Sequence, residues 1–195
     1  MIITKLIEPW KHFIVEHFFP QNILLEVMSQ FEIREGFEPW TGYAHRMGKF
    51  VQQYSPLTYE YLLSILPAFI KVCEDDLLER NLPTDASKYC VFQCMFCIDG
   101  IGYTVPIHCD TPQKCITFVI YVNGKGSCTS LCKKHGSEYV NSFLSDEFKD
   151  SSKVNHPHPI PNSALVFVPK DGITFHTVTP TSEVRHTVQF TIQLK

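Results

Sequence analysis

Several features are missing from this sequence, and each absence narrows the possible functions. No apolar run approaches the ~20 residues needed to cross a bilayer. The first ten residues, Met1 to Trp10, are interrupted too early by charge and proline to form a secretory signal peptide. Repeats and low-complexity tracts are also missing. These absences predict a soluble, cytoplasmic protein with no membrane partner.

A concentration of positive charge is missing too. The formal net charge is −3, and Lys133-Lys134 is the only adjacent basic pair. Proteins that bind nucleic acid usually carry a basic patch that contacts the phosphates. The sequence therefore argues against DNA or RNA as a partner.

The eight cysteines do not indicate a disulfide framework, because the chain carries no secretory signal. Several of them lie inside apolar runs, where a thiol packs like a small hydrophobic side chain. We expect reduced, mostly buried cysteines.

The length of 195 residues suits one domain spanning residues 1–195. We expect residues 1–84 to form a mostly helical support region after an extended lead-in over residues 1–19. Helical spacing predicts a helix over 20–32, a second from Ser55 that breaks or kinks at Pro67, and a third to about residue 78. Residues 36–54 are expected to form a loop.

From residue 85 onward the pattern changes to short strands rich in β-branched and aromatic residues. Strands are expected at residues 89–98, 116–122, 164–168 and 187–194, with a long polar connection over about 124–162. Helices followed by many short strands favour helices packed on a jelly roll, also called a double-stranded β-helix, of the cupin-like kind. Residues 85–195 would form this core.

The first candidate site lies in the segment from Gly102 to Asn123, where His108 and Asp110 are two residues apart. In an extended segment both side chains point to the same face. Together they form two thirds of a 2-His-1-carboxylate site for non-haem iron(II), and His176 could supply the third ligand. A buried, satisfied histidine and a turn aspartate remain the alternative.

The last strand offers a second candidate site around Arg185. Arg185 shares a face with Thr187, and a guanidinium that points into a barrel needs an anionic partner. The carboxylate of a dicarboxylate co-substrate would provide one with bidentate geometry. On the strand over 116–122, Tyr121 would contact the same carboxylate. Thr117 lies on the same face of this strand as Tyr121, although ordinary cross-strand packing explains Thr117 equally well. For Arg185, the alternative is an exposed arginine at the start of a strand.

Five segments together resemble the iron(II)- and 2-oxoglutarate-dependent dioxygenases, most closely the prolyl-4-hydroxylase-like branch. The segments are His108-Cys-Asp110, Thr117-Phe-Val-Ile-Tyr-Val-Asn123, Pro161-Asn-Ser-Ala-Leu-Val-Phe-Val168, His176-Thr-Val178 and Arg185-His-Thr187. The likeness covers residues 85–195 well and the first thirty residues loosely.

This resemblance implies a set of residue roles. His108, Asp110 and His176 would bind the metal and act in catalysis through it. Arg185 would bind the distal carboxylate of 2-oxoglutarate with help from Tyr121 and Thr187, and we expect Thr117 to contribute from the neighbouring strand.

The same resemblance implies a reaction. The cofactor would be Fe(II), the co-substrates 2-oxoglutarate and O2, and ascorbate an accessory reductant. Halogenating relatives have a small residue at the position of Asp110, so a retained carboxylate implies hydroxylation or oxidative demethylation. We expect a hydroxylase that releases succinate and CO2 and acts on a peptidyl side chain such as proline, or on a small molecule.

Two other kinds of function remain open. A non-catalytic jelly-roll binding or sensing module would need neither the triad nor Arg185. A cupin-type metalloenzyme that does not use 2-oxoglutarate generally has three or four histidine ligands, whereas this chain offers Asp110.

Two further metal-like patterns are disfavoured. Cys90, Cys94 and Cys97 match the spacing of a [4Fe–4S] site, but within one strand Cys97 would face away from the other two. Cys128, Cys132 and His135, with His156 or His158 as the fourth ligand, could bind zinc, although a solvated loop explains them better.

Overall fold

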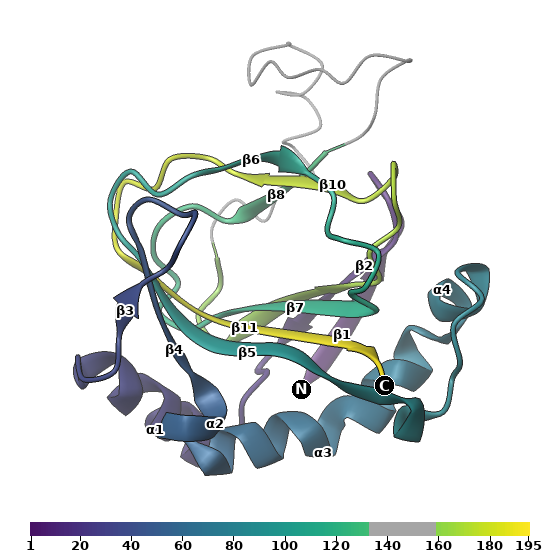
Figure 1. The fold of residues 1–195 in the computed structure, drawn as a ribbon, viewed down its shortest axis with the longest axis horizontal. Helices are drawn as coiled ribbons and strands as arrows, with labels where there is room; N and C mark the ends of the chain where they lie inside the picture. The colour runs from purple at the N-terminus through teal and green to yellow at the C-terminus, as the bar shows by residue number, and fades with distance from the viewer. Residues whose placement is uncertain (133–158) are drawn as a thin grey trace.

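Two sheets face each other in the computed structural model, which describes residues 1–132 and 159–195 (Figure 1). The eight-stranded major sheet contains, in spatial order, β1 (Ile2–Leu6), β2 (His12–Glu16), β9 (Ser163–Phe167), β7 (Ile116–Tyr121), β11 (Arg185–Leu194), β5 (Tyr89–Asp99), β4 (Arg46–Phe50) and β3 (Glu38–Pro39). The three-stranded minor sheet contains β6 (Val105–His108), β10 (Phe175–Val178) and β8 (Thr129–Cys132). All neighbouring strands are antiparallel, and the expected double-stranded β-helix is confirmed.

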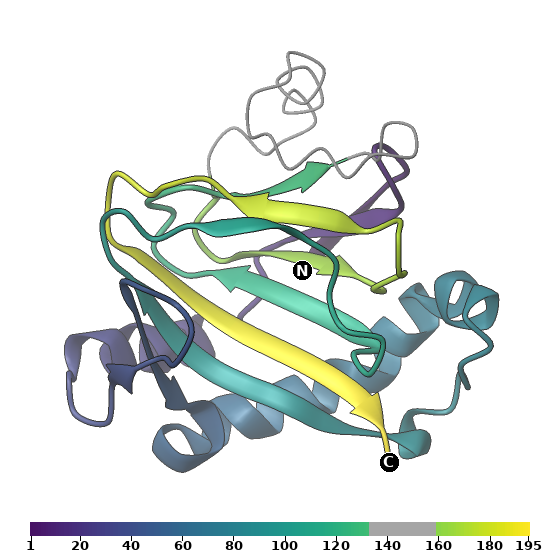
Figure 2. The same cartoon turned by 45° about the horizontal axis from the view of Figure 1, so that its top comes forward.

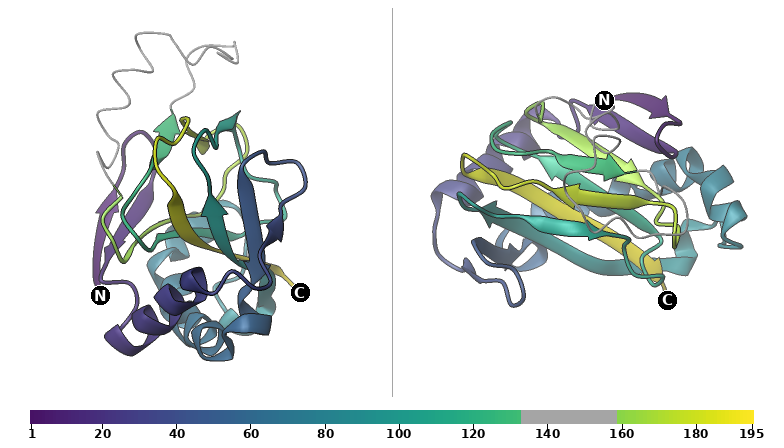
Figure 3. Two further views of the ribbon diagram at one scale, coloured as in Figure 1. Left: turned by 90° about the vertical axis from the view of Figure 1, so that its left-hand side faces the viewer. Right: turned by 90° about the horizontal axis from the view of Figure 1, so that it is seen from above.

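The helices cover the face of the major sheet that points away from the minor sheet (Figures 1 and 2). They are α1 (Gln21–Glu32), α2 (Val51–Tyr54), α3 (Pro56–Val72) and α4 (Glu74–Glu79), followed by the 3₁₀ turn η1 (Ala86–Lys88). The molecule therefore has three layers, with the major sheet in the middle, and Figure 3 shows the same order from the side. None of the helices in the described ranges combines the length and apolar character that a membrane span requires.

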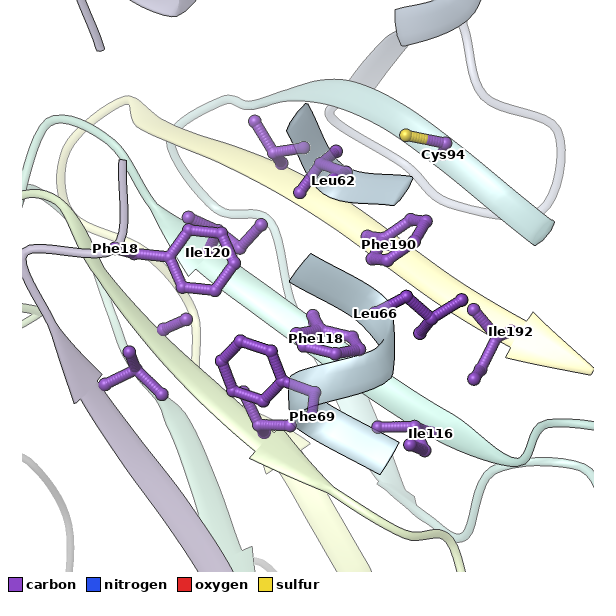
Figure 4. Close-up of a cluster of buried hydrophobic side chains, with 14 of the residues drawn as sticks. Phe18, Leu62, Leu66, Phe69, Cys94, Ile116, Phe118, Ile120, Phe190 and Ile192 are labelled. Carbon is purple, nitrogen blue, oxygen red and sulfur yellow. The ribbon is translucent and has the colours of Figure 1, made fainter. Parts of the chain in front are cut away.

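The main core lies between α3 and the major sheet (Figure 4). Leu62, Leu66 and Phe69 recur at helical spacing, so they form one stripe along α3. This stripe packs on Phe118 of β7 and Phe190 of β11, and the Phe69 and Phe118 rings meet edge to face at 5.0 Å. Each of these five side chains is at most 6% exposed, and each such burial stabilises the fold by about 1.5–3 kcal/mol.

Helix α3 continues through Pro67, where the sequence predicted a break or a kink in the chain. A proline inside a helix leaves the carbonyl four residues earlier without its N–H partner. That residue here is Leu63, which is 39% exposed and lies on the side of α3 away from the core. The apolar stripe of α3 faces the sheet on both sides of Pro67, and its burial outweighs the lost hydrogen bond.

The expectation of a loop over residues 36–54 was wrong, because this stretch contains β3, β4 and α2. Strand β4 pairs with β5, whose residues lie about fifty positions later, and Arg46 stands opposite Asp99. A strand whose partner is so distant has a weak local signal. As a result, residues 1–84 supply four strands of the major sheet besides the helices.

The two faces of the major sheet differ in character. On β11, Val188 and Phe190 point to the helices, whereas Arg185 and Gln189 point toward the minor sheet. Part of the space between the sheets is filled by a second apolar cluster of buried residues. It consists of Trp10, Ile14, Val119, Tyr121, Leu131, Leu165 and Phe167. The polar remainder of that space is where the candidate site lies.

Candidate metal centre

The three residues that the sequence singled out as metal ligands lie together. His108 on β6 stands directly opposite His176 on β10, and their ring centroids are 4.3 Å apart. Asp110 follows the end of β6 by two residues. One ligand atom from each of the three lies within 4.8 Å of the other two. Two imidazole nitrogens and one carboxylate form the facial donor set that leaves positions open on a divalent metal such as iron(II).

Both histidines are held by the same local contact. Nδ1 of His108 lies 2.9 Å from the carbonyl oxygen of Pro106, and Nδ1 of His176 lies 3.0 Å from that of Thr174. A carbonyl only accepts, so each Nδ1 carries the proton and donates it. The lone pair is then on Nε2, which is left to bind a metal, and the carbonyl fixes the ring orientation.

Asp110 is held by two side chains. Nζ of Lys114 donates to Oδ1 at 2.5 Å, and the hydroxyl of Thr117 donates to Oδ2 at 2.8 Å. Burial disfavours the ionised carboxylate, but the charge of Lys114, the charge that His176 carries at acid pH and both hydrogen bonds outweigh it and hold the pKa of Asp110 below its ordinary value. Each carboxylate oxygen keeps a further lone pair, so Asp110 remains able to bind a cation.

His176 is 7% exposed, and its surroundings favour the neutral ring. Burial, followed by the neighbouring His108, lowers the pKa of His176 to about 4. The phenyl ring of Phe167 closes one side at a centroid distance of 5.2 Å. At neutral pH, His176 is therefore uncharged, which is the form that binds a metal.

A pocket of about 190 Å³ extends from the triad into the space between the two sheets. At one end, its lining includes the three candidate ligands together with Lys114 and Thr117. Arg46 and Arg185 also line it, together with Tyr103 and Gln189. The pocket thus joins a metal-binding donor set to two guanidinium groups.

Arg185 is 1% exposed and already has protein partners. Its Nε donates to Oδ2 of Asp99 at 2.8 Å, its Nη2 lies 2.7 Å from the same oxygen, and its Nη1 donates to the carbonyl of Ser127 at 2.8 Å. The anionic partner expected for this buried guanidinium is therefore supplied in part by the chain itself.

The other expected co-substrate residues have different positions. Thr117 lines the pocket, and its hydroxyl bonds to Asp110. Tyr121 belongs to the apolar cluster, where its hydroxyl accepts from the backbone N–H of Thr129 at 2.9 Å. Thr187 is fully buried, and its hydroxyl has no hydrogen-bond partner in the described ranges. The pocket lining includes neither Tyr121 nor Thr187. Arg185 is nevertheless close enough to Tyr121 for its charge to oppose the rise that burial causes in the pKa of the Tyr121 hydroxyl.

Sequence reasoning missed Arg46, Asp99 and Lys114. Asp99 ends the strand that follows the helical region, and Lys114 lies four residues after Asp110, so their positions carried a weak signal. Arg46 fell in the expected loop, where no pattern in the sequence indicated a role at the site. Gln93, Met95 and Cys97 share one face of β5 but do not line this pocket, and Met95 lines a separate cavity.

The alternative metal patterns gain no support. Cys94 packs in the main core under the helices, and Cys97 faces the opposite way toward Arg46. Among residues 1–132 and 159–195, the triad is the only group of three such side chains close enough to hold a metal. The second pattern needs His135 and either His156 or His158, and these lie outside the described residues.

No protein-family model matches the sequence, and no curated protein matches it. Solved structures do match the fold. A prolyl-4-hydroxylase from Pseudomonas putida aligns with a TM-score of 0.62 and 14% identity over 93% of this chain and 91% of that one. A prolyl hydroxylase from Trichoplax adhaerens, in complex with a peptide fragment of the hypoxia-inducible factor oxygen degradation domain, gives 0.53 and 16% over 92% and 82%.

HygX from Streptomyces hygroscopicus, with nickel, 2-oxoglutarate and hygromycin B bound, gives a TM-score of 0.54 and 12% identity over 94% of this chain and 83% of that one. At such low identities the likeness establishes the fold. This chain therefore has the fold of these oxygenases.

Proposed function

We propose that this protein is an iron(II)- and 2-oxoglutarate-dependent oxygenase that hydroxylates its substrate. The observation that carries the proposal is one pocket that contains His108, Asp110 and His176 at one end and Arg185 further inside. A binding module needs no such combination, and a cupin without 2-oxoglutarate has no use for a buried arginine facing the metal ligands.

The donor set fits iron(II), since Nε2 of each histidine keeps its lone pair and Asp110 is ionised. Iron(II), once bound, supplies the redox chemistry by which O2 and 2-oxoglutarate become succinate, CO2 and a hydroxyl group on the substrate. Ascorbate would serve as an accessory reductant that keeps the metal in the ferrous state.

The residues of the chain would position the reactants. Thr117 and Lys114 hold Asp110 so that its carboxylate faces the two imidazoles. The guanidinium of Arg185 would receive the distal carboxylate of 2-oxoglutarate, a dicarboxylate with a 2-oxo group at its other end. The apolar cluster that includes Val119 and Phe167 keeps water from one side of the pocket.

For the substrate we propose a peptidyl side chain such as proline, or a small molecule. The prolyl hydroxylase from Trichoplax adhaerens holds a peptide, and HygX holds hygromycin B, so the shared fold accommodates both classes. Asp110 provides the carboxylate ligand that halogenating relatives lack, which favours hydroxylation or oxidative demethylation over halogenation. Nucleic acid is disfavoured by the net charge of −3.

The experiment measures succinate formed from 2-oxoglutarate with iron(II), ascorbate and O2, and compares the wild type with His108→Ala. Slow uncoupled turnover by the wild type and none by the variant is the expected result. Isothermal calorimetry with Mn(II) then tests whether 2-oxoglutarate binds only when the metal is present.

The control for this experiment is His17→Asn. His17 is exposed, and its backbone has a φ of 53°, which asparagine tolerates. Absence of both succinate formation and metal-dependent 2-oxoglutarate binding in the wild type would contradict the proposal. Binding without turnover would favour the sensing module instead.

A further inference from the structure

Three charged side chains form one row across the major sheet, and two of them line the inner end of the pocket. Asp99 on β5 stands opposite Arg46 on β4 and opposite Arg185 on β11. Asp99 is 0% exposed, Arg46 6% and Arg185 1%. Side chains in register on neighbouring strands touch directly, so the row forms as soon as the three strands pair.

One carboxylate serves both guanidinium groups. Nε of Arg46 donates to Oδ1 of Asp99 at 2.6 Å, and Nη2 donates to Oδ2 at 3.0 Å. Arg185 binds the Oδ2 atom through Nε and Nη2. Oδ2 therefore receives donors from both arginines, and the row carries two positive charges and one negative charge.

The surplus positive charge is buried. Tyr103 is 1% exposed and lies against both guanidinium carbons, at 4.3 Å for Arg46 and 5.5 Å for Arg185 from its ring centroid. The negative face of the ring offsets part of that charge. A buried charge without a full counter-charge is costly, so the row favours one additional anion.

Both arginines line the pocket, whereas Asp99 is absent from its lining. The carboxylate thus lies behind the guanidinium groups and leaves their outer sides facing the cavity. An anion that enters from the metal end meets the two cations first and is shielded from the one negative charge.

Counted over residues 1–132 and 159–195, both guanidinium groups also keep N–H donors for such an anion. Each arginine has five N–H donors. Arg46 gives two to Asp99, and its terminal nitrogens both lie 3.0 Å from the amide oxygen of Gln189 in the orientation that satisfies both groups, which leaves one. Arg185 gives two to Asp99 and one to Ser127, which leaves two.

We propose that Arg46 is a second co-substrate-binding residue and that Arg46 and Arg185 together receive the distal carboxylate of 2-oxoglutarate. Asp99 is the positioning residue that holds the two guanidinium groups side by side. The inference rests on the proposed function, because the ligand is the 2-oxoglutarate of that reaction. It assigns to the strand β4, which precedes the jelly-roll core in the sequence, a part in selecting a dicarboxylate.

The experiment compares two 2-oxo acids, because only one of them reaches the row. 2-Oxoglutarate has the distal carboxylate, and 2-oxobutyrate lacks it while keeping the groups that face the metal. Calorimetry with Mn(II) measures the affinity of both for the wild type, Arg46→Gln and Arg46→Lys. Arg46→Gln leaves Asp99 and Arg185 as a neutral pair, so we expect the variant to fold.

Arg46→Gln should lower the affinity for 2-oxoglutarate about 10- to 100-fold, the range typical of a lost hydrogen bond to a charged group. Its affinity for 2-oxobutyrate and for Mn(II) should stay at the wild-type value. Arg46→Lys should recover part of the preference for 2-oxoglutarate, since it keeps the charge but loses the planar fork. Met47→Gln, an exposed neighbour on β4, is the matched control.

An unchanged preference for 2-oxoglutarate over 2-oxobutyrate in Arg46→Gln would overturn the inference, and so would an equal loss for both acids. If Arg46→Gln does not fold, the same preference measured in Arg46→Lys decides, and a wild-type ratio there overturns it. If the wild type and Arg46→Gln bind 2-oxoglutarate equally well in the presence of Mn(II), this inference fails but the proposed function stands. Wild-type protein that binds neither acid contradicts both.

Discussion

The two ends of the pocket are held in place in different ways. At the metal end the supporting contacts are local, because His108 bonds to a carbonyl two residues earlier and Asp110 to a lysine four residues later. At the arginine end the contacts of Arg46 and Arg185 with Asp99 join residues 53 and 86 positions apart.

This difference separates two kinds of preorganisation. The metal ligands are oriented largely by their own chain segments, and β6 and β10 need only pair once to bring them together. The arginine row exists only when β4, β5 and β11 have formed in register. We therefore expect loss of Asp99, the carboxylate that both arginines share, to affect the stability of the fold, and changes at the metal end to affect ligand affinity.

The largest effect is expected from Asp99→Asn, which removes the only carboxylate of the row. Two buried guanidinium groups would then face each other without a counter-charge. Removing one partner of a buried ion pair typically lowers the free energy of unfolding by about 3–5 kcal/mol. Urea denaturation followed by circular dichroism measures the loss.

The control for that change is Asp75→Asn. Asp75 is 72% exposed and lies 3.7 Å from Lys5 and 3.5 Å from Lys11. Exposed pairs of this kind contribute about 0–1 kcal/mol. Similar losses in both variants would mean that burial of the row does not matter, and the contrast between the two ends would fail.

The same contrast explains how much could be predicted from the sequence. His108, Asp110 and His176 follow from spacing and from the chemistry of their side chains, and the structure brings them together. The strands 89–98 and 187–194 carry enough β-branched and aromatic residues to be predicted within a few positions.

The partners of Arg185 could not be predicted. A buried guanidinium needs an anion, but nothing local indicates that Asp99 lies beside Arg185, 86 positions away. Tyr121 was expected beside Arg185 because of its inward face, and no local pattern indicated that its hydroxyl also accepts a hydrogen bond from the N–H of Thr129. Register across strands decides such contacts, and a single sequence does not encode register locally.

At the metal end, Thr117→Val should weaken metal binding without unfolding the protein. The hydroxyl donates to Oδ2 of Asp110, and loss of a contact that orients a ligand typically lowers metal affinity about 10- to 100-fold. Competition with a fluorescent chelator for Mn(II) or Fe(II) measures it.

A matched control lies directly across the strands from Thr117. Thr191 pairs with it on β11 and is also buried, but its hydroxyl has no partner in the described part of the chain. Thr191→Val should keep the wild-type metal affinity. An equal loss in both variants would assign the effect to the shape of the pocket.

A pH experiment on metal-free protein tests the burial of His176. Its pKa is about 4 in the folded chain and ~6.5 in the unfolded chain. Between these values the unfolded state binds more protons, so the free energy of unfolding falls as the pH falls. Between pH 6.5 and 5.5 this contribution is about 1 kcal/mol. Urea titrations in chelator should give a shallower pH dependence for His176→Asn than for the wild type, and parallel curves would contradict the assignment.

The smallest effect is expected at Thr187. Its buried hydroxyl has no partner among the residues that the structure describes and lies outside the pocket lining, so valine of similar shape removes an unsatisfied group. Thr187→Val should leave the affinity for 2-oxoglutarate unchanged and raise the free energy of unfolding by up to about 1 kcal/mol. Calorimetry and denaturation of the same sample measure both, and a weaker affinity would assign Thr187 to the co-substrate site.

The order of strands in the major sheet has a consequence for solubility. Both outer borders of this sheet, β1 with β2 and β4 with β3, come from the first 50 residues. A fragment that begins at residue 85 would leave β9 and β5 with unpaired N–H and C=O groups along buried, largely apolar strands. Exposed borders of this kind recruit strands from other chains. The first 50 residues therefore protect the major sheet from aggregation, and we expect residues 85–195 to be insoluble when they are produced without them.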